Sequence, residues 1–114
     1  MRLKADIWIR AYLRTVARHG AFGAVVAHGD DDAGALYIKV SRLDGTARLF
    51  GPAPAGLETA DGDRAFAAVS GDGFRPEGEI DAALARERDF DPDLWIVEVE
   101  DREGRDFLGS WLVP

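Results

Sequence analysis

The sequence contains no cysteine, and only two of its 114 residues are histidines, His19 and His28. Without cysteine there is no disulfide, no thiolate nucleophile and no thiolate ligand for a metal ion. The histidines form no His-x-x-x-His pair, and there is no phosphate-binding loop or nucleophile elbow. We therefore expect no catalytic residue, no metal site and no cofactor, which favours a protein that is not an enzyme.

Long apolar runs are also missing from the sequence. No run of about 18 apolar residues occurs, so we expect no membrane-spanning helix. Residues 1–14 carry a charge every two to four positions, which interrupts the apolar segment that an export signal requires. A chain of this length supports one modest core, so the sequence predicts a single cytoplasmic domain over residues 1–114.

Residues 4–19 have the spacing of an amphipathic helix. Its apolar stripe, at 3.6 residues per turn, consists of Trp8, Ile9, Tyr12, Leu13 and Val16. Gly20 follows, where a residue in the left-handed conformation commonly ends a helix. A second helix is predicted from Pro76 to about Arg88, because proline suits the first helical position and acidic residues crowd the start of this segment.

Charge is distributed unevenly along the chain, whose net charge is −7. The first 20 residues carry a formal charge of +4, so the remaining 94 carry −11. That acidic body repels nucleic acid and anionic membranes, so neither is an expected partner. The first helix offers a candidate anion-binding stripe, formed by Lys4, Arg10, Arg14 and Arg18. The same stripe also fits a solvated helix face that balances the acidic body.

Two strand-like runs flank Asp44-Gly45, a dipeptide typical of a two-residue hairpin loop. With that loop, Val40 pairs with Leu49. The predicted core face then holds Leu36, Ile38, Val40, Ala47 and Leu49. A three-residue loop shifts the register by one and places Arg48 beside Val40 on the core face, where a charge is costly. We therefore expect the two-residue loop.

The opposite face of the predicted hairpin carries aromatic and cationic side chains, those of Tyr37, Lys39, Arg48 and Phe50. Aromatic residues and arginine are enriched at protein interfaces. These four residues are therefore the candidate surface for a protein partner or for a second copy of the chain. The alternative is a face that is packed across the strands or covered by a helix.

Three further strands complete the predicted fold. Phe22–His28 and Arg64–Ser70 are short, whereas the run that begins at Leu94 is apolar on both faces and indicates a central strand. A turn at Arg102-Glu103-Gly104 would pair that strand with Phe107–Leu112, a segment that fits either a strand or a short helix. The prediction is an α+β domain in the order α-β-β-β-β-α-β-β. Its mostly antiparallel sheet of five or six strands carries both helices on one face.

Two groups of carboxylates resemble parts of metal-dependent hydrolase sites. Asp30, Asp31 and Asp32 are adjacent, but cation-binding loops need alternating acidic positions, so we expect a solvated turn. Glu98 and Glu100 share one face of the predicted central strand, an arrangement that acid–base or metal chemistry uses. A metal-dependent hydrolase is therefore one alternative function. A nucleic-acid-associated protein that uses the basic helix is the other.

Three segments resemble a known family: Arg2–Ile9, Arg42–Pro54 and Phe90–Arg105. They read RLKADIWI, RLDGTARLFGPAP and FDPDLWIVEVEDREGR. The family consists of small alphaproteobacterial proteins known as domain of unknown function 1491, and the resemblance covers nearly the whole chain. It implies a bacterial, cytosolic, stand-alone domain and transfers no activity or site residue. The leading hypothesis is a small non-enzymatic binding module that associates with itself or with a protein partner.

Overall fold

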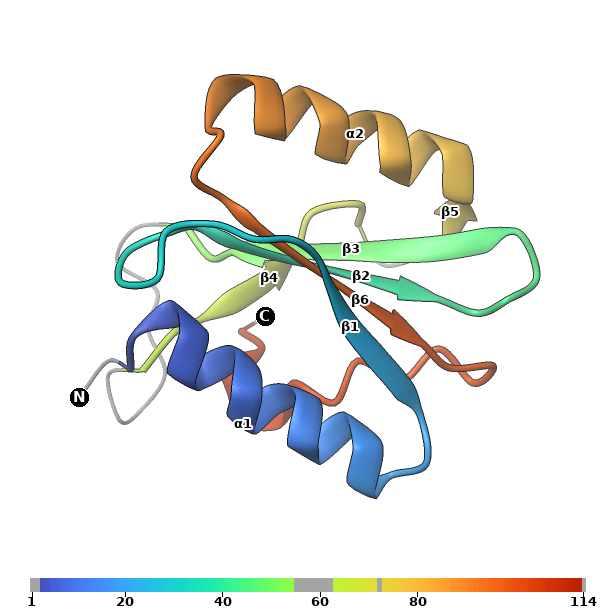
Figure 1. Cartoon of the computed structure of the whole chain (residues 1–114). Helices are drawn as coiled ribbons and strands as arrows, with labels where there is room; N and C mark the ends of the chain where they lie inside the picture. The colour runs from blue at the N-terminus through green and yellow to red at the C-terminus, as the bar shows by residue number, and fades with distance from the viewer. Residues whose placement is uncertain (1–2, 55–62, 72, 114) are drawn as a thin grey trace.

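Helices α1 and α2 cover opposite faces of one sheet in the computed structural model, which describes residues 3–54, 63–71 and 73–113 (Figure 1). Within these residues the elements in chain order are α1 (Ala5–Arg18), β1 (Phe22–Ala27), β2 (Leu36–Ser41), β3 (Thr46–Pro52), β4 (Phe66–Ala68), β5 (Arg75–Pro76), α2 (Glu77–Phe90), β6 (Trp95–Glu100) and the 3-10 helix η1 (Gly109–Trp111). The α+β class and the order of elements through β6 are as predicted, with the two-residue strand β5 as an addition.

Strand β6 lies inside the sheet, whose strands run in the order β1-β6-β2-β3-β4, with β5 paired to β3. Strand β6 is parallel to β2, whereas the other strand pairs of the described residues are antiparallel. Trp95, Ile96 and Val97 are all buried, although successive side chains point to opposite faces. The prediction that this segment forms a central strand is confirmed.

The segment that follows β6 does not return as a strand. Strands β1 and β2 occupy both edges of β6, so no edge is left for residues 107–112. This segment instead passes on the α1 side of the sheet, where η1 forms (Figure 1). Trp111 contacts Trp8 of α1, with ring centroids 4.9 Å apart. The predicted second hairpin is therefore wrong, and a short terminal helix, the alternative for this segment, is present.

The hairpin between β2 and β3 has a three-residue loop, Leu43–Gly45, so the predicted register is wrong by one residue. Val40 pairs with Arg48, and Ile38 pairs with Phe50. The cost expected for a charge beside Val40 does not arise, because Arg48 is only partly buried. Its guanidinium group lies 4.9 Å from the centre of the Phe50 ring. Arg48 therefore stays at the margin of the core.

The one-residue shift moves side chains between the two faces of the sheet. Ala47 and Leu49 were predicted beside Val40, but they lie on the α2 face and pack with Ile80 and Leu84 of α2. The α1 face buries a second cluster that includes Trp8, Tyr12, Val16, Ile38, Val40, Phe50, Val97 and Val99. The prediction that both helices share one face is wrong, because the inner strands are apolar on both faces and each face needs a cover.

The helices themselves lie close to their predicted positions. Helix α1 matches the predicted segment 4–19, and Gly20 follows it with a φ of 81°. Helix α2 begins directly after Pro76 and continues to Phe90. In the described ranges no helix has the length and apolar character needed to cross a membrane. Glycine and proline residues also predict a loop over residues 51–62; residues 51 and 52 instead end β3, and residues 55–62 lie outside the described residues.

Candidate functional site

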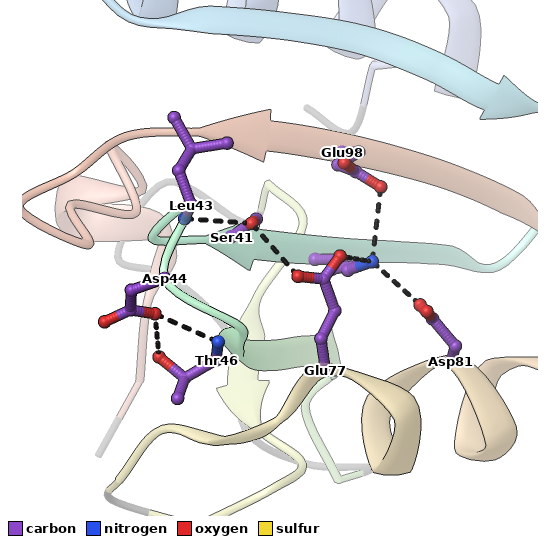
Figure 2. A network of polar contacts seen from close by, with 8 residues as sticks. Ser41, Leu43, Asp44, Thr46, Glu77, Asp81 and Glu98 are labelled. Atoms are coloured by element: carbon purple, nitrogen blue, oxygen red, sulfur yellow. Dashed lines mark hydrogen bonds and ion pairs between the residues drawn. The ribbon is translucent and has the colours of Figure 1, made fainter.

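Lys39 is a buried cation in the middle of β2, and it points to the α2 face of the sheet. Its Nζ atom lies 2.8 Å from Oε2 of Glu77 and 2.8 Å from Oδ1 of Asp81, both on the first two turns of α2. Oε1 of Glu98 on β6 lies 3.4 Å away (Figure 2). Only 4% of Lys39 is exposed. The cluster therefore joins α2 to two strands of the sheet.

The surroundings of Lys39 decide its protonation state. Burial lowers the pKa of Lys39, but the hydrogen bonds to Asp81 and Glu77 and the charge of Glu98 outweigh it and raise the pKa above its ordinary value. The ion pairs therefore favour the cationic form of Lys39. Three carboxylates around one ammonium group leave an excess of negative charge on this face of the sheet.

The structure does not bring the four residues of the predicted partner surface together on one exposed face. Tyr37 and Lys39 lie on the α2 face, and the Tyr37 hydroxyl donates to Oε2 of Glu87 on α2 at 3.2 Å. Burial, followed by the nearby charge of Glu87, raises the pKa of Tyr37. Phe50 is buried in the cluster on the opposite face, beside Arg48. A partner role for these residues stays a prediction.

The predicted anion-binding stripe lies along α1. Arg10, Arg14 and Arg18 are exposed, on the side of the helix that faces away from the sheet. Lys4 precedes the helix, and its Nζ atom lies 3.4 Å from Oδ1 of Asp32. The three arginines therefore form an exposed basic face, and anion binding by the stripe stays a prediction.

The aspartate cluster forms a turn whose carboxylates have separate neighbours. Oδ2 of Asp30 accepts the backbone N–H groups of Asp32 and Ala33 at 3.2 and 2.9 Å. Oδ1 of Asp31 lies 3.0 Å from Nε2 of His28. No group of three or more histidine and acidic side chains in the described part of the chain is placed to hold a metal ion. The structure therefore offers no support for the metal-dependent hydrolase alternative.

Strand β1 lies at the end of the sheet and is the site that sequence reasoning missed. In the part of the chain that the structure describes, β1 pairs with β6 alone, so its outer edge faces solvent (Figure 1). Three of its apolar side chains are exposed: Phe22 by 61%, Val25 by 39% and Val26 by 56%. The strand itself was predicted, but its edge position follows from the long-range insertion of β6, which no local pattern reveals.

On the α2 side of β1, the exposed side chains of Phe22 and Val26 lie next to the acidic face of the sheet. Ala24 lies directly opposite Glu98 and Phe22 directly opposite Glu100, so each pair shares this face. A groove of about 240 Å³ runs between β1 and α2, and Val26, Leu84, Arg88, Ile96 and Glu98 are among its lining residues. We call Phe22, Ala24, Val26, Glu98 and Glu100, together with the outer edge of β1, the β1 surface.

A second concave region of about 380 Å³ lies at the end of the sheet where β1 begins. Its lining includes Phe22, Leu43 and Glu100. Leu43 is 51% exposed and has a φ of 63°, a conformation that is rare for a bulky side chain. The β1 surface is thus bounded by a hollow beside α2 and by another at the hairpin loop.

Two helices on opposite faces of a mixed, mostly antiparallel sheet define a small α+β domain with a buried lysine cluster and one apolar edge. The chain belongs to the family described as protein of unknown function (DUF1491), whose model matches residues 3–109. This confirms the resemblance noted in the sequence. A search of the curated proteins found no match.

Solved structures of the same family are similar to this chain. A DUF1491 protein from Caulobacter crescentus, in a crystal structure, is 38% identical with a TM-score of 0.80, and the match covers 100% of both chains. A second structure, of a DUF1491 protein from the same bacterium and determined by NMR, is 41% identical with a TM-score of 0.77 and covers 100% of this chain and 99% of that one. The solution structure of a protein from A. tumefaciens is 37% identical with a TM-score of 0.77. The match covers 98% of this chain and 93% of that one.

Proposed function

We propose that this protein is a small non-enzymatic binding module that docks a protein partner on the β1 surface. The observation that carries the proposal is the edge position of β1 together with the exposure of Phe22 and Val26 on its α2 side. An edge strand presents backbone N–H and C=O groups to which another chain can add a strand. Exposed apolar side chains beside that edge supply the burial that stabilises a complex.

The Lys39 cluster supports a binding role over a catalytic one. An amine that acts as a base or a nucleophile needs a lowered pKa, whereas the pKa of Lys39 is raised. The ion pairs of Lys39 with Glu77 and Asp81 instead hold α2 on the sheet. Because Leu84 and Arg88 of α2 line the groove beside β1, the same cluster fixes one wall of the β1 surface.

The proposal places this binding role in the cytoplasm of an alphaproteobacterium. The sequence has no cysteine, as suits a reducing compartment in which disulfides are rare. Self-association belongs to the same proposal, because a second copy is one candidate partner for an edge strand. Sedimentation across a range of protein concentrations separates a second copy from a different protein partner.

A photo-crosslinking amino acid at position 26, expressed in an alphaproteobacterial host, tests the proposal. Position 69 is the matched control, because Val69 is 51% exposed and Val26 is 56% exposed. The expected result is a discrete adduct from position 26, none from position 69, and loss of the adduct when Phe22→Lys is added. Equal crosslinking at the two positions, or no adduct at position 26, would overturn the proposal.

A further inference from the structure

We infer that the occupant of the β1 surface is an extended basic segment of a partner protein, in which Lys or Arg alternates with apolar residues. This inference rests on the proposed function and adds the chemistry of the partner. It is carried by the pairing of the small residue Ala24 with Glu98, beside a strand edge that is otherwise apolar.

An added strand would lie about 4.8 Å outside β1, and its alternate side chains would point to the α2 face. On that face they meet Phe22 and Ala24 of β1, and beyond them Val26, which lines the groove beside α2 and lies where the pairing of β1 with β6 is irregular, between Val25 and Ala27. Phe22 and Val26 offer apolar contact, whereas Ala24 has only a methyl group. A long side chain beside Ala24 therefore has a path across β1 to the next strand.

The groups at the end of that path are carboxylates. Strand β6 lies about 10 Å from the added strand, which is two strand spacings. Glu98 is directly opposite Ala24 and Glu100 directly opposite Phe22. A Lys or Arg side chain of the added strand can extend over Ala24 while the Glu98 side chain extends toward it from β6, and together they span this distance. An Asp or Glu side chain at the same position of the added strand would instead be repelled by Glu98.

The charges around these two glutamates favour a cation. The ammonium group of Lys39 lies 2.8 Å from the carboxylates of Glu77 and Asp81 but 3.4 Å from that of Glu98. Lys39 therefore neutralises the charge of Glu98 only in part. Glu100 takes part in no ion pair within residues 3–54, 63–71 and 73–113.

The neighbouring elements supply only part of the opposing charge. Arg88 lines the groove beside α2, and Arg102 and Arg105 line the hollow at the other end. Arg105 is already held by Asp101 and Glu103, at 2.9 and 3.3 Å. The face thus keeps a negative excess that a basic segment complements.

A second copy of this chain complements the β1 surface less well. Antiparallel pairing of β1 with its copy would extend the sheet and keep equivalent faces on the same side. The copy would then bring its own Glu98 and Glu100 to the acidic face. The basic helix α1 lies on the opposite face, so its arginines would not reach these carboxylates. Charge complementarity therefore favours a basic partner over self-association.

Titration of the isotope-labelled protein with three blocked synthetic peptides, followed by amide chemical shifts, tests the inference. The basic peptide is Thr-Lys-Val-Lys-Val-Lys-Thr, and the other two replace each Lys with Glu or with Ser. We expect the basic peptide to shift the amides of Phe22–Ala27 and to bind more weakly as salt is added. We expect Glu100→Gln to weaken this binding about two- to fivefold. Glu79→Gln removes the same charge at the start of α2, where Glu79 pairs with Arg75 of β5 beside β3, and should leave this binding unchanged.

Each other outcome overturns the inference in a recognisable way. Equal binding of all three peptides at β1 would keep the edge as a docking site but remove the basic partner. Shifts of the β1 amides that grow with protein concentration, without peptide, and vanish in Phe22→Lys would identify a second copy. Failure of every peptide to perturb β1 would overturn the inference alone if position 26 still gives its adduct, and absence of that adduct would overturn the proposed function as well.

Discussion

The Nζ atom of Lys39 lies 2.8 Å from Oδ1 of Asp81, which joins the centre of strand β2 to the second turn of helix α2. Glu77 on the first turn is equally close, so two successive turns of the helix hold one buried cation (Figure 2). Helix α2 buries only two residues, Ile80 and Leu84, along its length. The ion pairs therefore add to a small apolar contact between α2 and the sheet.

Replacement of Lys39 by Met keeps the apolar stem but leaves three carboxylates without their cation. We expect the free energy of unfolding to fall by about 2 kcal/mol. This is less than the ~3–5 kcal/mol typical of a fully buried pair, because Glu77 and Asp81 are 35% and 57% exposed. Urea unfolding followed by tryptophan fluorescence measures the change.

The control for this prediction is Arg75→Met. The Arg75–Glu79 pair is more than half exposed on both sides, so its loss should cost less than about 1 kcal/mol. Equal losses in the two variants would show that the Lys39 cluster contributes no more than a surface ion pair.

Asp101 should make the stability depend on pH in acid. Side-chain hydrogen bonds from Arg105, at 3.1 and 2.9 Å, hold the pKa of Asp101 below its ordinary value of 3.8 although the residue is buried. The stability that ionised Asp101 contributes is therefore present above a pH of about 3.8 and is lost as the pH falls through the lowered pKa. Asp101→Asn should be less stable at pH 7 and should lose less stability between pH ~4 and ~2. Urea unfolding across this range measures the effect, and an unchanged acid profile would contradict it.

Local patterns predicted the elements of this fold better than their arrangement. The 3.6-residue spacing identified α1, and apolar residues on both faces identified β6 as a central strand. The insertion of β6 between β1 and β2 depends on contacts across more than fifty residues, which local patterns do not contain. That insertion puts β1 at the sheet edge, so the candidate site was not predictable before the fold was known.

The error in the hairpin register has a specific physical cause. The prediction assumed that Arg48 would be buried in the core if it lay beside Val40, where a charge is costly. Helices α1 and α2 cover the two faces of β2, and the Arg48 side chain lies at the margin of the core beside the Phe50 ring. An apolar pattern that fits two registers cannot choose between them until the covering helices are known.

Tyr12 holds the segment after β6 against α1 and should contribute measurably to stability. Its hydroxyl donates to the carbonyl oxygen of Asp106 at 2.6 Å, and burial raises the pKa of Tyr12. Tyr12→Phe leaves that carbonyl without its donor, so we expect a loss of about 1–2 kcal/mol in urea unfolding. Tyr37→Phe is the control, because its partner Glu87 lies 3.2 Å away in a more exposed setting. A larger loss for Tyr37 than for Tyr12 would reverse this ranking.

Gly29 and Gly78 should respond in opposite ways to alanine. A Cβ atom on Gly29 would collide with the backbone of Asp93 and Leu94, which precede β6 and cannot yield without moving the strand. Gly78 lies on α2, and a Cβ there meets nothing within 4 Å. We therefore expect Gly29→Ala to destabilise the protein by more than about 2 kcal/mol. Gly78→Ala should stabilise it by about 0.5–1 kcal/mol, because alanine favours the helix.

Thermal and urea unfolding of the two single variants, measured together, check this pair of expectations. Stabilisation by Gly78→Ala combined with a neutral Gly29→Ala would show that the turn after β1 can shift away from β6. The position of β1 against β6 would then be less firmly held than the close approach of Gly29 to Asp93 indicates. Since the β1 surface depends on Ala24 lying opposite Glu98, the same two measurements bear on how rigidly that surface is held.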